Sequence, residues 1–397
     1  MILNAKFKNL LLIALTIFSI ASCKAQTTKE DCFKTGADRP ELYMPLLQNK
    51  TIAVVTNQTG LMNDRTHLVD YLVSNKIKVK SIFAPEHGFR GNADAGEHVK
   101  NGVDTKTGVP IVSLYGNNKK PTKQQLQGID VVLFDIQDVG VRFYTYISTL
   151  TYVMEAAAEN NIEVVVLDRP NPHDGYVDGP VLKNKWKSFV GMHQVPVVYG
   201  LTIGEYGKMV NGEKWLEKGL TAQYTLIPMQ GYRKNSRYPL LERPSPNLPN
   251  DVSINLYPSL CFFEGTQVSV GRGTDLPFQI YGSPWTKNLP YQFTPRPNFG
   301  AKDPFLNGKT CYGENLSNDK ADLRKLNLEW LLKSYQAYKN PQQNFFLTNL
   351  FFDKLAGTDE LRKQIISGKT ENEIRASWNA DLEKFKRIRS KYVIYSD

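Results

Sequence analysis

The chain of 397 residues has few cysteines and lacks several common catalytic motifs. Its four cysteines are widely spaced and form no CxxC pair, which argues against a zinc or redox centre. No GxGxxG, GxxxxGK[ST] or GxSxG sequence occurs. Dinucleotide binding, P-loop nucleotide binding and a serine nucleophile of the hydrolase type therefore lack their usual signatures.

Hydrophobic runs long enough to cross a membrane are also scarce. A shorter apolar run lies near the N-terminus. Lys6 and Lys8 precede the apolar run Leu10–Ile20, which is followed by Ala-Ser and then Cys23. The run is short for a membrane-spanning helix, and small residues before a cysteine suit a signal peptidase. We expect residues 1–22 to be a lipoprotein signal peptide. The alternative is an ordinary secretory signal in which the cysteine is incidental.

Lipidation of the cysteine at the cleavage site would leave residues 23–40 as a tether. Lys24 stands where an aspartate would argue for retention in the inner membrane. We therefore expect a cell-envelope lipoprotein, attached to the outer membrane and facing the periplasm. The remaining cysteines, Cys32, Cys261 and Cys311, are then an odd set, in which buried thiols or one disulfide are expected.

Disorder is excluded, because 41% of the residues are hydrophobic. The formal net charge of +10 invites a nucleic-acid interpretation, but the strongest basic run has a simpler explanation. It falls on a predicted amphipathic helix, where a solvated face accounts for it, and export separates the protein from nucleic acid. We expect no nucleic-acid partner. The run comprises Lys384, Lys386, Arg387, Arg389 and Lys391.

β-Branched apolar runs alternate with amphipathic stretches in the first half of the chain. This alternation predicts an α/β fold with a Rossmann-like open parallel sheet, which we assign to residues 41–210. The later sequence is rich in proline and aromatic residues and predicts a smaller α+β domain over residues 211–397. Five strands are predicted, at residues 51–56, 79–84, 110–115, 131–135 and 164–168.

Polar and ionisable residues follow four of these strands. The carboxyl ends of parallel strands meet at one edge of a sheet, where ligands usually bind. Each residue alone has a structural explanation; Asp135, for example, could form an ion pair with Arg142. Four strand ends that deliver such residues together favour a functional rim. The candidates are Asn57, Glu86, His87, Arg90, Asp135, Asp138, Arg142, Tyr144, Asp168, Arg169 and Asn171.

Glu86 is the first candidate for a catalytic group. A carboxyl placed directly after a buried strand suits a general acid. Asp135 and Asp138 would supply the second carboxylate that glycosidic cleavage usually requires. Arginines offer forked donors to an anionic substrate group, namely Arg90, Arg142 and Arg169, joined by Arg272 if the second domain closes over the rim.

The second domain has a further dense group of candidates. Aromatic residues beside glycine and charge suit contact with a sugar, and they surround Glu264, Arg272 and Asp275. A core strand followed by a turn, with Glu264 and Arg272 as a surface ion pair, explains the same residues equally well. Histidines and acidic residues near Glu86 have no HExxH spacing, so no metal site is expected.

Seven segments, in this order along the chain, resemble the bacterial exo-β-N-acetylmuramidase family of glycoside hydrolases. They are VTNQTG (55–60), PEHGFRG (85–91), DIQDVGVRFYTY (135–146), LDRPNP (167–172), GLTIGEY (200–206), PSPNLP (244–249) and FEGTQVSVGRGTDLPFQIYGSPW (263–285). The resemblance covers nearly the whole chain after the signal peptide. It implies a Rossmann-like domain, a smaller C-terminal domain and an active-site cleft between them.

The resemblance also implies a reaction. Members of the family hydrolyse terminal β-1,4-linked N-acetylmuramic acid from the non-reducing ends of peptidoglycan fragments, without a metal or organic cofactor. The catalytic glutamate of the PEHG motif corresponds to Glu86. The lactyl carboxylate of the sugar would be a partner for Arg90, Arg142 or Arg272. Retention or inversion at the anomeric carbon, the oligomeric state and the tolerance for attached peptide are not encoded in these motifs.

A second class of protein fits the same features. Two α/β lobes around a cleft, tethered to a membrane, also describe a non-catalytic periplasmic lipoprotein that binds carbohydrate or muropeptides. Arginines and aromatic residues serve binding as well as catalysis. Release of free N-acetylmuramic acid would distinguish the enzyme from the receptor.

Overall fold

A seven-stranded sheet organises the first half of the chain, with strand order β3-β4-β2-β1-β5-β6-β7. Residues 33–90, 101–318 and 323–396 are described in a computed structural model. Neighbouring strands run parallel except β3 and β4, which pair antiparallel at one edge. The strands are β1 (Thr51–Thr56), β2 (Lys78–Ala84), β3 (Gly102–Val103), β4 (Pro110–Ser113), β5 (Val131–Asp135), β6 (Glu163–Leu167) and β7 (Gln223–Ile227).

Helices cover both faces of this sheet. Alternate residues of a strand point to opposite faces, so Ile52 and Val54 pack with α2 and α3, whereas Ala53 and Val55 belong to the core that holds α5 and α6. Because both faces are covered, the strands are apolar throughout. The elements are η1 (Gly36–Asp38), α2 (Pro40–Leu47), α3 (Leu68–Ser74), α4 (Lys123–Leu126), α5 (Tyr146–Glu159), η2 (Asn184–Trp186), α6 (Ile203–Gly212) and η3 (Glu217–Gly219).

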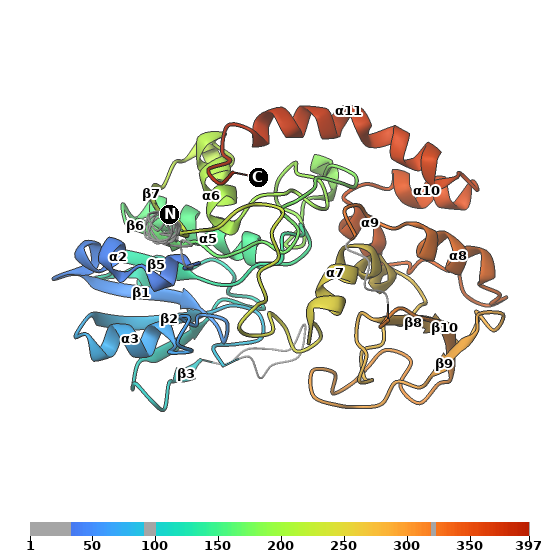
Figure 1. The fold of residues 1–397 in the computed structure, drawn as a ribbon, viewed down its shortest axis with the longest axis horizontal. Helices are drawn as coiled ribbons and strands as arrows, with labels where there is room; N and C mark the ends of the chain where they lie inside the picture. Colours follow the sequence, from blue (N-terminus) through green and yellow to red (C-terminus); the bar gives the residue numbers. More distant parts are fainter. Residues whose placement is uncertain (1–32, 91–100, 319–322, 397) are drawn as a thin grey trace, which may run out of the picture. The chain divides into compact units, whose positions relative to one another are not determined.

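The second half of the chain combines a small antiparallel sheet with helices (Figure 1). The sheet has the order β8-β10-β9. Its elements are α7 (Asp251–Leu260), η4 (Cys261–Gly265), β8 (Ile280–Ser283), β9 (Tyr291–Phe293), β10 (Cys311–Asn315), α8 (Glu329–Ala337), α9 (Phe351–Ala356), α10 (Glu360–Ile366) and α11 (Glu371–Arg389). The expected α/β fold with a smaller α+β part is therefore confirmed.

The long helix α11 leads the chain back to the first half (Figure 1). At the end of this helix, Arg389 Nε donates to the carbonyl of Gly200 at 2.8 Å, and beyond it Tyr395 Oη donates to Asp168 Oδ2 at 2.6 Å. Residues 34–397 form one compact unit. Strand β7 extends the large sheet beyond residue 210, at which we expected the first domain to end.

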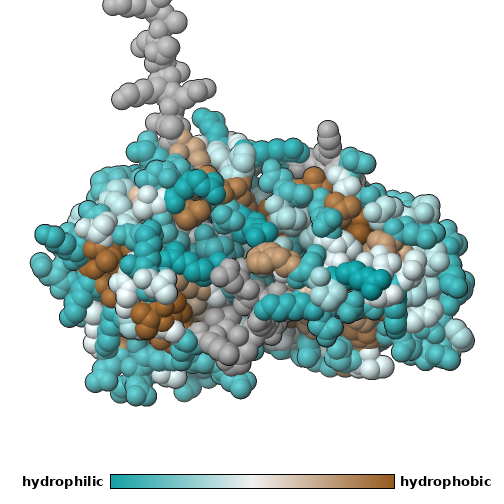
Figure 2. Space-filling model, turned by 90° about the horizontal axis from the view of Figure 1, so that it is seen from below, coloured by the Kyte–Doolittle hydropathy of each residue, from teal (hydrophilic) through white to brown (hydrophobic). Residues whose placement is uncertain are grey.

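Most predicted elements lie where the sequence placed them. The five predicted strands correspond to β1, β2, β4, β5 and β6, with ends that differ by at most two residues. The short strands β3 and β7 were not predicted. Seen from below, the surface is mainly hydrophilic with separate hydrophobic areas (Figure 2).

The N-terminal expectations fall largely outside the described residues. The signal peptide over residues 1–22, lipidated Cys23 and Cys32 lie there, as does most of the tether over residues 23–40. In the described part of the chain, no helix has the length and apolar character needed to cross a bilayer. Cys261 and Cys311 are free, buried thiols.

Candidate active site

Three neighbouring strands bring the leading candidates to one edge of the large sheet. Strand β1 lies between β2 and β5, and all three run parallel. Asn57 follows β1, Glu86 follows β2, and Asp135 is the last residue of β5. The arrowhead of β1 points toward the half of the molecule that contains α7 and the small sheet (Figure 1). The predicted rim is therefore present, and it faces the second half of the chain.

Glu86 sits on a tight turn after β2. The turn is closed by a hydrogen bond from the Gly88 amide to the Pro85 carbonyl at 3.0 Å, and His87 and Gly88 have φ values of +71° and +76°. Two consecutive left-handed residues explain the glycine, which adopts this conformation without strain. The turn leaves the Glu86 side chain partly exposed, whereas His87 is buried.

Two neutral hydroxyl groups hold the Glu86 carboxyl. Tyr115 Oη donates to Oε1 at 2.8 Å, and Thr145 Oγ1 donates to Oε2 at 2.9 Å. Neither residue was among the predicted site residues. Both follow strands of the same sheet, β4 and β5, and this position could have marked them as site candidates. Only the folded chain shows that they meet Glu86. The two hydroxyls fix both carboxyl oxygens.

A hydrogen-bonded network connects this region with the loop before α7. Asn57 Nδ2 donates to Tyr146 Oη at 2.8 Å, and Tyr144 Oη donates to the carbonyl of Pro244 at 2.7 Å. The rings of Tyr144 and Tyr146 are 4.9 Å apart, and Tyr144 also contacts Tyr257 of α7 at 5.8 Å. Burial raises the pKa of both Tyr144 and Tyr146, so these phenols stay protonated and act as donors.

Asp135 forms a buried ion pair at the end of β5. Arg169 Nε donates to Oδ1 at 2.6 Å, and Arg169 Nη2 donates to Oδ2 at 2.8 Å. The arginine also binds the carbonyl of Leu61. A structural ion pair of Asp135 was one sequence interpretation, but its partner is Arg169, since Arg142 points elsewhere. Both oxygens of Asp135 are thus engaged by one guanidinium group.

Asp138 is a buried carboxyl with an incomplete set of partners. Its Oδ2 accepts hydrogen bonds from the Gly140 amide, at 2.7 Å, and from Tyr199 Oη. Within the described residues, its Oδ1 has no hydrogen-bond partner. Burial raises the pKa of this carboxyl to about 6, against the opposing effect of its hydrogen bonds.

Three other predicted residues are buried and hydrogen-bonded to distant parts of the chain. The Arg142 guanidinium binds the carbonyls of Pro180, Val195 and Leu355, and its burial lowers the pKa to about 9. Asp168 accepts hydrogen bonds from Thr202 Oγ1, the Gly204 amide and Tyr395, and burial raises its pKa to about 6. Asn171 Nδ2 donates to the carbonyl of Leu201. These contacts join loops to one another.

The remaining predicted residues lie at exposed or partly exposed positions. Arg90 pairs with Asp104, with Nη2 and Oδ1 2.7 Å apart. Arg272 donates from Nε to Glu264 Oε1 at 2.8 Å, and its Nη2 is also 2.8 Å from Oε1. Asp275 is exposed. The predicted surface pairing of Glu264 with Arg272 is therefore present.

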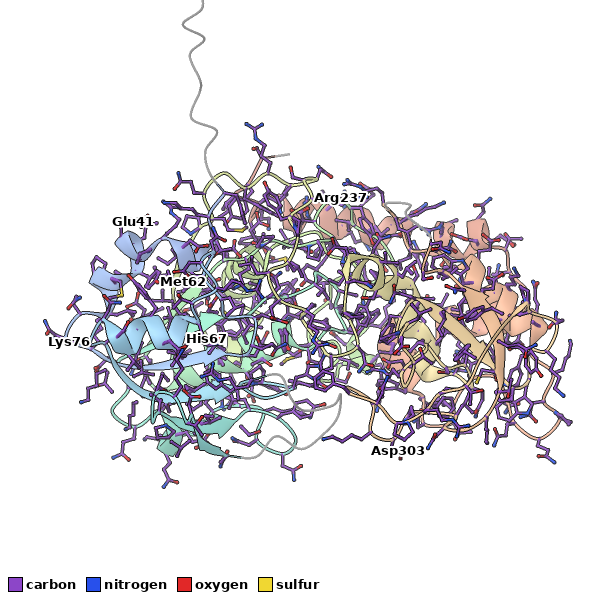
Figure 3. All side chains as sticks on the ribbon, turned by 60° about the horizontal axis from the view of Figure 1, so that its bottom comes forward. Glu41, Met62, His67, Lys76, Arg237 and Asp303 are labelled. Atoms are coloured by element: carbon purple, nitrogen blue, oxygen red, sulfur yellow. The ribbon has the colours of Figure 1, made fainter. Side chains whose placement is uncertain are left out.

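Two cavities flank the rim. One, of about 360 Å³, lies beside Asn171 and Arg237; the other, of about 420 Å³, is bordered by His67 and Arg90. Figure 3 shows that the labelled residues Arg237 and His67 lie well apart. Over the described ranges, no three histidine, cysteine or acidic residues are grouped as metal ligands.

The fold and the site define a class of enzyme. A carboxyl group held by hydroxyl donors at the carboxyl edge of a parallel α/β sheet, opposite a second structural part, is suited to acid-assisted hydrolysis. Comparison with known families makes the class specific. Residues 52–252 match the N-terminal model, and residues 255–395 the C-terminal model, of the exo-β-N-acetylmuramidase NamZ. The chain therefore belongs to this family of glycoside hydrolases.

Individual relatives agree with the family assignment. The peptidoglycan β-N-acetylmuramidase NamZ of Bacillus subtilis (strain 168) is 39% identical over 395 residues, which cover 94% of each chain. Crystal structures of two DUF1343 family proteins from Bacteroides fragilis superpose with TM-scores of 0.83 and 0.77, at 45% and 29% identity. Each alignment covers 92% of this chain and 99% of the other.

Proposed function

We propose that the chain is an exo-acting β-N-acetylmuramidase that hydrolyses terminal, non-reducing β-1,4-linked N-acetylmuramic acid from peptidoglycan fragments during cell-wall turnover and recycling. The observation that carries this proposal is the Glu86 carboxyl, held by Tyr115 and Thr145 at the edge of the sheet. The activity named for the Bacillus subtilis relative supports the choice of substrate.

Glu86 acts as the general acid. It donates its proton to the glycosidic oxygen as the bond from that oxygen to the anomeric carbon breaks, so the leaving sugar departs as a neutral alcohol. A water molecule then supplies the hydroxyl group at the anomeric carbon, and the proton that the water loses passes to the carboxyl groups of the site, which restores the protonated acid for the next turnover. The hydroxyls of Tyr115 and Thr145 orient the carboxyl toward the bond, because each fixes one of its oxygens.

Asp138 is the better candidate for the second carboxylate. Both oxygens of Asp135 are bound by Arg169, which leaves that residue to support the wall of the site. Asp138 retains an oxygen without a hydrogen-bond partner in the described structure. We assign it to assist either the attacking water or the 2-acetamido group of the substrate, since both need an acceptor near the anomeric carbon.

Arg272 is the candidate partner for the lactyl carboxylate. The guanidinium group of Arg142 binds backbone carbonyls, and that of Arg169 binds Asp135. Arg272 uses Nε and Nη2 on Glu264 and is still partly exposed, with its side chain at 23%. Its Nη1 can therefore bind a carboxylate of the substrate.

We also propose that the protein is exported and anchored through Cys23, facing the periplasm from the outer membrane. The support is the sequence of residues 1–24. Lipidation would place the enzyme among peptidoglycan fragments in the envelope. Metabolic labelling with a clickable fatty acid should label the full chain and not a Cys23→Ser variant; equal labelling of both would contradict the anchor.

The catalytic proposal is tested by Glu86→Gln. Turnover of a chromogenic N-acetylmuramide is expected to fall about 100- to 10,000-fold, the usual contribution of a general acid. Glu383→Gln, a charge-matched change on the exposed face of α11, should leave turnover unchanged. Thermal melting establishes that both variants fold.

Two outcomes would overturn the proposal. Near wild-type turnover by folded Glu86→Gln would remove Glu86 from the chemistry. Stoichiometric binding of N-acetylmuramyl-N-acetylglucosamine by the wild type, without release of free N-acetylmuramic acid, would instead identify a receptor.

A further inference from the structure

Phe299 is an exposed aromatic residue in the segment between β9 and β10. The side chain is 56% exposed, although phenylalanine is usually buried. It belongs to the sequence Arg296-Pro297-Asn298-Phe299-Gly300, which the catalytic assignment does not use. Figure 3 labels Asp303 of the same segment, at the lower edge of the molecule and to the right of its middle.

The backbone that carries Phe299 is fixed from several sides. Asn298 and Ala301 exchange two backbone hydrogen bonds, at 3.1 and 3.2 Å, so Phe299 and Gly300 form the tip of a tight turn. Asn247 Nδ2 donates to the Gly300 carbonyl at 2.6 Å, and Asn298 Nδ2 donates to the Thr274 carbonyl at 3.0 Å. An aromatic group on a held turn loses little conformational freedom when it binds a ligand.

Phe299 is connected with the region around Glu86. The Arg243 guanidinium lies over its ring, 4.7 Å from the centroid. Gln58 Nε2 donates to the carbonyls of Arg243 and Pro244, at 3.2 and 3.3 Å. The Pro244 carbonyl also accepts the hydroxyls of Tyr144 and Tyr146, at 2.7 and 3.4 Å. Tyr146 directly follows Thr145, which binds Glu86.

We propose that Phe299, backed by Arg243, is a stacking platform for a sugar ring on the leaving-group side of the scissile bond. This inference rests on the proposed exo-muramidase activity. One face of the ring is covered by the guanidinium, and the exposed surface offers an apolar, electron-rich face. The C–H face of a β-linked pyranose has the complementary character.

The leaving-group side follows from exo action. A terminal sugar ends inside the site, so the rest of the glycan extends outward over the rim. Glu86 is partly buried at the sheet edge, whereas Phe299 is exposed. The Arg243–Pro244 segment lies between the two regions, because Arg243 covers the Phe299 ring and Pro244 binds the tyrosines that flank Thr145. The platform therefore determines preference for longer glycans and takes no part in proton transfer.

The test compares two substrates with Phe299→Ala. One is the tetrasaccharide of alternating N-acetylmuramic acid and N-acetylglucosamine, and the other is a chromogenic N-acetylmuramide, which has no sugar in its leaving group. We expect the KM for the tetrasaccharide to rise about three- to tenfold with kcat unchanged, the range of one aromatic stacking contact. The KM for the chromogenic substrate should change by less than about twofold. Phe299→Trp should restore the KM.

Phe305→Ala is the matched control, because Phe305 lies in the same segment and is 47% exposed. It should leave both substrates unaffected. An unchanged KM in Phe299→Ala, an equal loss on both substrates, or the same loss in Phe305→Ala would each overturn the platform. If the wild type releases N-acetylmuramic acid from neither substrate, the proposed function itself fails, which is a different result.

Discussion

Strands β2 and β5 flank β1 and both lead into a carboxyl group, yet the two carboxyls have opposite surroundings. Glu86 is partly exposed and accepts hydrogen bonds from two neutral hydroxyls. Asp135 is fully buried and is bound at both oxygens by Arg169. Two strand ends at one sheet edge therefore carry one group suited to chemistry and one suited to support.

The difference follows from the charge of the neighbours. The Asp135 carboxylate compensates the Arg169 charge in the protein interior, where an uncompensated charge is costly. The hydroxyls of Tyr115 and Thr145 are neutral, so neither needs a counter-charge from Glu86. A general acid must cycle between its two forms, so the neighbours, more than the position, separate the two roles.

The largest expected loss of stability comes from breaking the ion pair between Asp135 and Arg169. Asp135→Asn leaves Arg169 buried without its counter-charge and should lower the free energy of unfolding by about 3 to 5 kcal/mol, the usual cost of removing one partner from a buried ion pair. Urea unfolding measures this loss. Glu86→Gln, at the other strand end, should keep the unfolding midpoint close to that of the wild type.

Two further variants sharpen this contrast. Asp135→Leu combined with Arg169→Met removes both charges and should recover much of the lost stability, because apolar replacements of buried pairs are often neutral. The exposed Glu383→Gln should leave the midpoint unchanged. If Asp135→Asn is as stable as Glu383→Gln, the pair does not support the site.

Asp138 is expected to make the free energy of unfolding depend on pH, by about 3 kcal/mol. Burial raises its pKa from 3.8 to about 6, so the folded state binds this proton more tightly than the unfolded chain does. Stability therefore decreases as the pH rises through this interval and is regained on acidification. Two pKa units correspond to about 3 kcal/mol.

Asp138→Asn isolates this contribution from the other carboxyls. The unfolding free energy of the wild type, measured relative to the variant in urea, should increase between about pH 7 and about pH 4. Asp168 has a similarly raised pKa and is present in both proteins, so it cancels. A constant difference across this range would show that Asp138 does not titrate as its burial requires.

Much of the fold could be predicted from the sequence, because buried parallel strands are continuous apolar runs. Strands β1 and β5 were placed at their observed ends. Strand β7 was missed because it is the edge strand, and most of its residues are only partly buried. Strand β3 has two residues and leaves almost no pattern.

The position of the site could also be predicted, but its partners could not. Strand ends fix which residues reach the rim, whereas the contacts there join distant segments. Thr145 meets Glu86 from 59 residues away, and Arg142 binds the carbonyl of Leu355 from 213 residues away. Such pairings depend on the packed fold, so local pattern could not separate the two arginines Arg142 and Arg169.

The smallest expected effect compares a buried arginine with a partly exposed one. Arg169 is 3% exposed and binds Asp135 and Leu61, whereas Arg272 is 23% exposed and engages Glu264 through Nε and Nη2. Arg272→Met should raise the KM for a chromogenic N-acetylmuramide about tenfold, the lower range for a charge-assisted hydrogen bond. The exposed Arg387→Met on α11 should have no effect.

An analogue in which the lactyl carboxylate is methyl-esterified decides whether that group is the partner of Arg272. The ester cannot form the ion pair, so wild type and Arg272→Met should bind it with the same KM. An equal loss on acid and ester would place Arg272 with the structural arginines. A loss confined to the acid would assign Arg272 to recognition of the muramic acid carboxylate, because only that interaction differs between the two substrates.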